Sequence, residues 1–225
     1  MFRTIKKIRK ISASQQIHAA LRERIIALEF IPGQNLSRAE IAEDYGVSQT
    51  PVRDAMLRLE EDGLLHIYPQ SKTEVSKIDV AHARKTQFLR LSLEIEVARR
   101  LITSGSGDNL KLAEHSLLQQ KQAFEADEMD NFVALDRAFH RALFEAAEVP
   151  DLWDLVTDRS GHIDRLRQLN LPDPGKAAEI IAYHQRILDA IKAGDAETAE
   201  SEVRGHLTGT LSNVDNIMQR HPEFF

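Results

Sequence analysis

The sequence contains no cysteine, and this absence excludes disulfide bonds, thiolate catalysis and cysteine-based zinc sites together. It also has no stretch that is long and apolar enough to cross a membrane. The basic N-terminal segment is not followed by the apolar run of a signal peptide, so we expect a cytoplasmic protein. With 225 residues, of which 42% are hydrophobic, the chain is long enough for two domains with cores of their own.

Charge is unevenly distributed along the chain. Residues 1–78 carry 12 Lys and Arg against 10 Asp and Glu, whereas residues 79–225 carry 17 against 25, which gives a net charge of −6. Five of the N-terminal cations lie within the first ten residues, in a basic arm that we assign to residues 1–13. Such an arm is commonly a solvated tail, although it also suits contacts with phosphates or a minor groove. The N-terminal part is therefore the part suited to a polyanion.

Residues 37–63, SRAEIAEDYGVSQTPVRDAMLRLEEDG, have the pattern of a helix-turn-helix. Ser37 and Glu40 have the spacing of a capping box, and Gly46 can make the turn after a short helix. Ser48 is placed to cap a second helix, which Gly63 ends. The outer face of this second helix presents polar and basic side chains, the types that contact bases in the major groove. We expect four of them to bind DNA, namely Gln49, Thr50, Arg53 and Arg58.

Segments on both sides of this motif complete a winged helix. An amphipathic helix precedes it and ends at a turn formed by Pro32 and Gly33. Residues 64–68 and 73–75, joined by a turn, have the pattern of a two-stranded wing. The alternative is an ordinary helical hairpin with solvated arginines, but it does not account for these flanking segments. We therefore assign a winged-helix domain to residues 14–78.

From Asp79 onward no convincing strand occurs, and glycine is almost confined to candidate turns. The interruptions of helical periodicity predict an antiparallel bundle of six helices. These helices are expected at residues 79–103, 108–126, 129–147, 151–170, 176–193 and 195–220. The predicted fold class is thus mainly α, with an all-α domain at residues 79–225 after the winged helix.

Polar residues interrupt the apolar faces of three of these helices. Asp136 and His140 lie one turn apart on the third helix, while His184 lies on the fifth and His206 on the sixth. Each histidine alone is typical of a hydrogen-bonded core residue. Three histidines and a carboxylate on three helices suit a metal site inside a bundle. These ligands predict a divalent metal, Zn²⁺ first, with Ni²⁺, Co²⁺ or Mn²⁺ as alternatives.

A second set of polar residues is suited to line the same interior. Arg90 and Glu94, one turn apart on the first bundle helix, form either a surface ion pair or a pocket wall whose guanidinium holds a carboxylate. Arg159 and His162 on the fourth helix are either solvated or turned inward. Asn213 lies on the apolar face of the sixth helix. We regard these five residues as candidates for binding a small ligand.

Two motifs, in this order, resemble the GntR family of transcriptional regulators and its FadR/VanR-type subgroup. The run PGQNLSRAEIAEDYGVSQTPVRDAMLRLEEDGLL resembles the winged-helix pattern of the family. The runs RLSLE at 90–94, DRAFH at 136–140 and YHQRILDAIKAGD at 183–195, followed by His206 and Leu207, resemble its effector-binding domain. The resemblance implies metal ligands at the aspartate and three histidines named above, and an arginine near the effector pocket at Arg90.

The resemblance also implies DNA contacts and two departures from the family pattern. Its DNA-contacting positions fall on Ser48, Thr50 and Arg53, and its wing tip falls on Gln70, Ser71 and Lys72. Gln49 stands where the family usually has arginine, and Ala39 stands where a basic residue is common, with Arg38 displaced by one position. Glutamine prefers adenine where arginine prefers guanine, so the operator is expected to differ from the usual one.

The expected protein is a homodimeric repressor that places two recognition helices in successive major grooves of an imperfect palindrome of double-stranded DNA. A small organic acid would bind the metal and change DNA affinity through its different affinities for two arrangements of the protein. An enzyme is the first alternative, because such a metal activates water, but it leaves the winged helix unexplained. In two further alternatives the metal itself is the signal, or it is only structural.

Overall fold

The computed structural model describes residues 11–105, 109–173 and 175–225, which are mainly helical, as the sequence predicts. They form two compact units, one up to Lys77 and one from Ile78. The five cations of the predicted basic arm, in residues 1–10, lie outside the described residues. Among the described residues, no helix is both long and apolar enough to span a bilayer.

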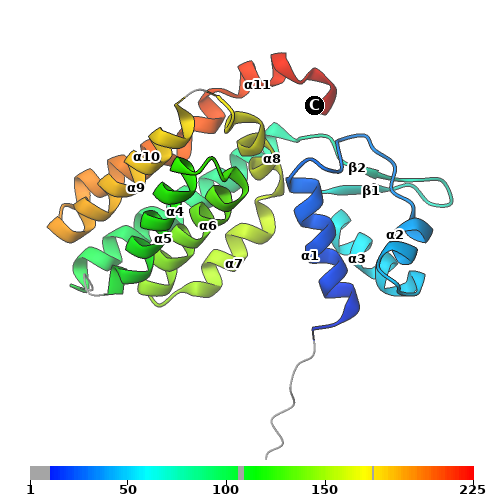
Figure 1. The fold of residues 1–225 in the computed structure, drawn as a ribbon, viewed down its shortest axis with the longest axis horizontal. Coiled ribbons are helices and arrows are strands. Elements are labelled where there is room, and N and C mark those ends of the chain that lie inside the picture. Colours follow the sequence, from blue (N-terminus) through cyan, green and yellow to red (C-terminus); the bar gives the residue numbers. More distant parts are fainter. Residues whose placement is uncertain (1–10, 106–108, 174) are drawn as a thin grey trace, which may run out of the picture. The chain divides into compact units, whose positions relative to one another are not determined.

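The first unit is a three-helix core with a two-stranded wing (Figure 1). Its elements are α1 (Ala13–Ile26), α2 (Arg38–Asp44), α3 (Gln49–Glu61), β1 (Leu65–Ile67) and β2 (Thr73–Val75). The strands pair antiparallel, with Leu65 opposite Val75 and Ile67 opposite Thr73. The inner faces of the three helices and the wing meet in one apolar core that includes Leu21, Ile25, Val52, Met56 and Leu59. This packing leaves the outer face of α3 exposed.

Local sequence explains how α2 and α3 begin. The Ser37 hydroxyl accepts the Glu40 N–H at 3.3 Å, which is one half of the predicted capping box, and Gly46 makes the turn at φ +62°. Ser48 occupies the N-cap position of α3, but the predicted capping bond from its side chain is absent. The physical reason is Pro51, since it occupies the third helical position and has no N–H to donate. The Ser48 side chain is therefore exposed at the start of α3.

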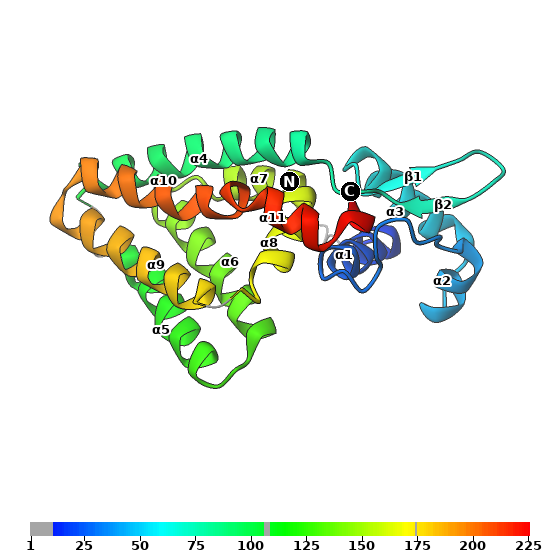
Figure 2. The ribbon, with the colours of Figure 1, turned by 90° about the horizontal axis from the view of Figure 1, so that it is seen from above.

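The second unit is an all-α bundle built around an apolar core (Figure 2). Its helices are α4 (Val80–Thr103), α5 (Lys111–Glu125), α6 (Met129–Ala146), α7 (Pro150–Arg159), α8 (Gly161–Asn170), α9 (Lys176–Ala193), α10 (Ala196–Ser212) and α11 (Val214–Arg220), followed by a short 3₁₀ turn, Pro222–Phe224. Helix α4 packs along α10, α10 packs along α9, and α5 packs against both α6 and α9. The interior is therefore reached by side chains from several helices.

Two of the six predicted bundle helices are each divided in two. The predicted helix at 151–170 breaks at Ser160, whose hydroxyl donates to the Thr157 carbonyl at 2.8 Å. The predicted helix at 195–220 breaks at Asn213, whose side-chain N–H group donates to Asn170 Oδ1 at 2.8 Å. Short polar side chains that bond elsewhere compete with the helical backbone, and the break follows. The six predicted helices thus correspond to eight α-helices among the described residues from Ile78 onward.

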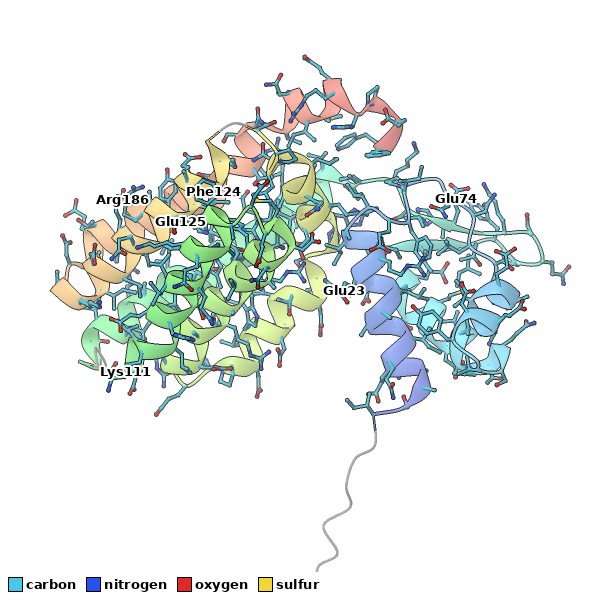
Figure 3. All side chains as sticks on the ribbon, viewed as in Figure 1. Glu23, Glu74, Lys111, Phe124, Glu125 and Arg186 are labelled. Carbon is cyan, nitrogen blue, oxygen red and sulfur yellow. The ribbon has the colours of Figure 1, made fainter. Side chains whose placement is uncertain are left out.

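The outer faces of the second unit carry many charged side chains. Figure 3 shows Lys111 and Glu125 on α5 and Arg186 on α9, all three exposed. Arg186 also pairs with Glu202 on α10, with Arg186 Nε 2.7 Å from Glu202 Oε2. The core, by contrast, is formed by apolar side chains such as Leu101 and Phe144. Buried charged and imidazole groups inside this core therefore require an explanation.

Candidate metal centre and DNA-binding surface

All nine residues predicted to contact DNA have exposed side chains in the first unit. The structure brings one group of them together on the first two turns of α3, namely Ser48, Gln49, Thr50 and Arg53. Arg58 lies in the last turn of the same helix and Arg38 begins α2. The wing residues 70–72 form the turn between β1 and β2, where Lys72 pairs with Glu74, so Glu74 partly offsets its charge. Exposure at these positions is what a DNA-contacting surface requires.

The structure brings Asp136, His140, His184 and His206 to one point inside the second unit, and we call these four residues the ligand cluster. One ligand atom from each lies within 4.8 Å of the others. His206 Nε2 lies 3.1 Å from His140 Nε2 and 3.2 Å from His184 Nε2, and His184 Nε2 lies 3.4 Å from Asp136 Oδ1. All three imidazoles are buried, and the carboxylate is partly buried. Three nitrogens and one oxygen thus converge within the reach of a single ion.

A hydrogen bond to Gln120 fixes which ring nitrogen of His184 faces the cluster. His184 Nδ1 lies 2.9 Å from Oε1 of the buried Gln120, and an amide oxygen only accepts, so Nδ1 carries the proton. His184 Nε2 therefore presents a lone pair to the cluster. His140 Nδ1 lies 2.9 Å from Glu94 Oε2, although its direction falls outside hydrogen-bond geometry. His206 Nε2 lies about 3 Å from the Nε2 atoms of His140 and His184, a distance at which a shared proton or cation joins the nitrogens, and this arrangement fits a metal ion.

Aromatic side chains hold two of the imidazole rings. Phe139 stacks on His184 with 3.9 Å between ring centroids, and Trp153 stacks on His140 at 5.8 Å, each pair being inclined by 13°. These rings restrict rotation of the imidazoles and exclude water from one side of the cluster. The site is therefore preorganised by packing as well as by hydrogen bonds.

Electrostatics keep the cluster in the form that binds cations. Burial lowers the pKa of His184 to about 3 and holds the pKa of His206 well below its usual value, so both imidazoles are neutral at pH 7. Burial alone would raise the pKa of Asp136, but nearby positive charges, among them the guanidinium groups of Arg167 and Arg90, lower that pKa, so the carboxylate is ionised. Neutral imidazoles and an ionised carboxylate are the states that ligate a divalent metal.

Arg90 and Glu94 form a buried wall beside the cluster. Arg90 Nε donates to Glu94 Oε1 at 2.5 Å, and the two side chains are only 6% and 3% exposed, which rules out the surface ion pair. The guanidinium carbon lies 5.3 Å from the ring centroid of Trp153. Arg90 Nη2 is buried and has no hydrogen-bond partner among the described residues. A buried, charged donor without a partner is costly and indicates an anion or water that completes the site.

The other three candidates for ligand binding have different surroundings. Arg159 is exposed, and its backbone carbonyl accepts the Thr86 hydroxyl at 3.1 Å. His162 is buried, but its Nδ1 accepts the Asp79 N–H at the start of α4. Asn213 lines a separate open pocket of about 300 Å³, to which the ligand cluster does not contribute. The structure therefore joins Arg90 and Glu94 to the cluster and leaves these three apart from it.

Sequence reasoning missed Gln120 and Arg167. Gln120 orients His184, and its own Nε2 has no partner among the described residues. Arg167 on α8 is partly buried; burial first, and the charge of Arg90 second, lower its pKa to about 10. The signal for Gln120 was a polar residue on the buried face of α5, in line with Ala113 and Leu117. No comparable signal marked Arg167, because it is one of several charged residues on α8 and does not stand out from Asp164 and Arg165.

Comparison with known proteins agrees with this architecture. Residues 13–75 match the gntR family of bacterial regulatory proteins, and residues 87–209 match the FCD domain. An HTH-type transcriptional regulator in an unstable DNA locus of Streptomyces ambofaciens is 32% identical over an alignment of 221 positions, which covers 94% of this chain and 89% of that protein. The HTH-type transcriptional repressor RspR of Escherichia coli K12 is 31% identical over 212 residues, 94% of this chain and 93% of RspR.

A solved structure shows the same fold. The structure of McbR/YncC from E. coli aligns with 94% of this chain and 100% of its own length, with a TM-score of 0.77 at 22% identity. Together, the two family matches account for the winged helix and for most of the helical unit. The relatives are transcriptional regulators rather than enzymes. The chain therefore belongs to the GntR family, and it is a DNA-binding transcriptional regulator with a C-terminal FCD domain.

Proposed function

We propose that this regulator is a homodimeric repressor whose operator affinity is controlled by a small carboxylate bound at a metal in the second unit. The observation that carries the proposal is the ligand cluster itself, with its converging nitrogen and oxygen atoms beside the unpartnered Nη2 of Arg90. The donor set of three imidazole nitrogens and one carboxylate oxygen favours Zn²⁺, and Ni²⁺, Co²⁺ or Mn²⁺ would be accepted with further ligands. A bound metal would supply a positive centre for an anionic ligand.

Each residue around the cluster then has a distinct task. Asp136 and the three histidines hold the ion, while Gln120 keeps His184 in the tautomer that presents Nε2. Glu94 connects Arg90 to His140, because its two oxygens lie 2.5 Å from Arg90 Nε and 2.9 Å from His140 Nδ1. A ligand that changes the position of Arg90 would therefore act on α4 and α6 together.

The chemical class of the ligand follows from the charges that face the site. The planar guanidinium of Arg90 has a free N–H group, and carboxylates match this donor geometry. Arg167 adds a second positive charge near Arg90. A ligand without an acceptor group would leave the buried Nη2 of Arg90 without a hydrogen-bond partner, at a cost in binding free energy. The site thus favours small organic acids.

The DNA side of the proposal rests on α3. In a homodimer, two copies of this helix would enter successive major grooves of an imperfect palindrome, with half-sites about one helical turn apart. Gln49 at the start of α3 favours adenine at the position that it contacts. RspR is named a repressor, and we infer repression here, relieved when the carboxylate binds. Because a repressor of this kind acts on DNA, we expect the protein in the cytoplasm.

The experiment that tests this function measures operator affinity in the presence of small carboxylates. An operator is first selected from random duplexes with the zinc-loaded chain. We expect one class of carboxylate to lower operator affinity at least tenfold and to raise the melting temperature by several degrees. Chelation of the metal should abolish both effects. If no carboxylate acts and zinc alone changes operator affinity, the metal is the signal and the proposal is wrong.

Arg53 provides a test of base recognition. It is exposed on the second turn of α3, and Arg53→Ala should weaken binding to the selected operator by ~1–3 kcal/mol. The loss should be much smaller on a duplex changed only at the base pair that Arg53 contacts. Fluorescence anisotropy with both duplexes measures the difference. An equal loss on every duplex would make Arg53 a phosphate contact instead.

A further inference from the structure

Helix α4 exposes one row of side chains at intervals of four residues. The row consists of Arg84, Phe88, Ser92 and Glu96, and we call it the α4 stripe. Phe88 is 75% exposed, more than any other large hydrophobic residue that the structure describes. In Figure 2, α4 forms one edge of the second unit, and no other described element of that unit lies over its outer side. The stripe is therefore a surface of this unit, while Arg90 and Glu94 occupy the opposite, buried face of the same helix.

The two charged residues of the stripe form no ion pair with each other. Neither Arg84 nor Glu96 takes part in an ion pair among the described residues. The Ser92 hydroxyl donates to the Phe88 carbonyl at 2.8 Å, so it needs no further partner. Ser92 is thus a small side chain, with its hydroxyl already hydrogen-bonded, next to the large apolar side chain of Phe88. An exposed phenylalanine next to a residue with a small side chain is typical of a protein–protein contact, because the small residue leaves room for a large side chain of the partner.

The order of residues along the stripe is self-complementary. When two copies of α4 cross antiparallel, with their midpoints near residue 90, Phe88 of each copy meets Ser92 of the other. In the same alignment, Arg84 of each copy meets Glu96 of the other. Rows of side chains at i and i+4 are also the ridges that pack most often between helices. A two-fold dimer requires this kind of reciprocal match, in which residue i contacts j and j contacts i.

We propose that the α4 stripe is the two-fold interface between two copies of this chain. The inference rests on the proposed function, which requires a homodimer, and adds the surface that forms it. Helix α5 also exposes Leu112 and Leu118, but these residues lie six positions apart on different sides of the helix and do not form a row. The stripe has a further consequence, since α4 also carries Arg90 and Glu94. Ligand contacts and the subunit contact would then lie on two faces of one helix.

Charge reversal tests the interface. Sedimentation equilibrium of the full, zinc-loaded chain should show a dimer whose dissociation constant rises at least about tenfold in Phe88→Asp. Arg84→Glu and Glu96→Arg should each weaken the dimer, and the double variant should restore it, because the pair is regenerated in reverse. Leu118→Asp on α5 is the matched control and should leave the dimer unchanged. Circular dichroism and zinc binding verify that each variant is folded.

Cross-linking gives an independent test, because the chain has no cysteine of its own. The double variant Arg84→Cys/Glu96→Cys should form a covalent dimer on oxidation. Arg84→Cys alone should not, since the two copies of residue 84 would lie about 18 Å apart along the helices. The proposal is overturned if Phe88→Asp dimerises normally, if the charge swap fails to restore the dimer, or if the wild-type chain is monomeric. A wild-type dimer that depends on the stripe but binds no operator would support the interface and contradict the proposed function.

Discussion

Zinc added to chelator-stripped protein is expected to raise the melting temperature of the second unit by roughly 10 °C when free zinc is about a thousand times its dissociation constant. The stabilisation is about 4 kcal/mol, because the ion binds the folded cluster and not the unfolded chain. His206→Gln should weaken zinc binding by at least about 100-fold, since it removes a nitrogen that lies within 3.2 Å of both other imidazole Nε2 atoms. Calorimetry with competing chelators measures both quantities.

Two further variants make this prediction specific. Gln120→Leu should weaken zinc binding by about 10- to 100-fold, because the tautomer of His184 is no longer fixed. His115→Gln is the matched control, since His115 is exposed on α5 outside the cluster. If zinc stabilises the His206→Gln protein as much as the wild type, then the ion binds elsewhere.

The ligand cluster could be predicted from sequence because its signal is local. A histidine one turn after an aspartate on an amphipathic helix, and single histidines within two other apolar faces, are visible without knowledge of the packing. The contacts that tune the cluster are not local. Glu94 was expected to pair with Arg90, but its approach to His140 depends on how α4 packs against α6. Gln120 likewise reaches His184 only because α5 lies along α9.

Helix breaks explain most of the remaining differences between expectation and structure. In a continuous helix at 151–170, Arg159 and Arg167 would lie about two turns apart on nearly the same side of the helix. The break at Ser160 starts a new helix, so Arg159 is exposed while Arg167 lies near the cluster. Asn213 leaves the apolar face of α10 for the same reason, because it ends that helix and bonds to Asn170. Periodicity predicts the faces of a helix only while the helix continues.

Replacement of Arg90 by lysine is expected to reduce the affinity for the active carboxylate by roughly 100-fold, or about 3 kcal/mol. Lysine keeps the positive charge beside Glu94 but loses the planar fork and the buried Nη2. It is preferable to alanine, which would leave Glu94 as an unpaired buried charge and destabilise the fold by ~3–5 kcal/mol. Zinc affinity should change by only a few fold, because Arg90 is not a ligand. Titration of the zinc-loaded protein with the carboxylate measures the loss.

Arg141→Lys is the matched control for this prediction. Arg141 follows His140 on α6, but it is exposed and pairs with Glu145 at 2.8 Å. Its replacement should leave carboxylate affinity unchanged. If Arg90→Lys binds the carboxylate as tightly as the wild type, then Arg90 serves only to hold Glu94. If Arg90→Lys loses zinc as well, the guanidinium acts through Glu94 on His140, and the metal and ligand sites are one coupled unit rather than neighbours.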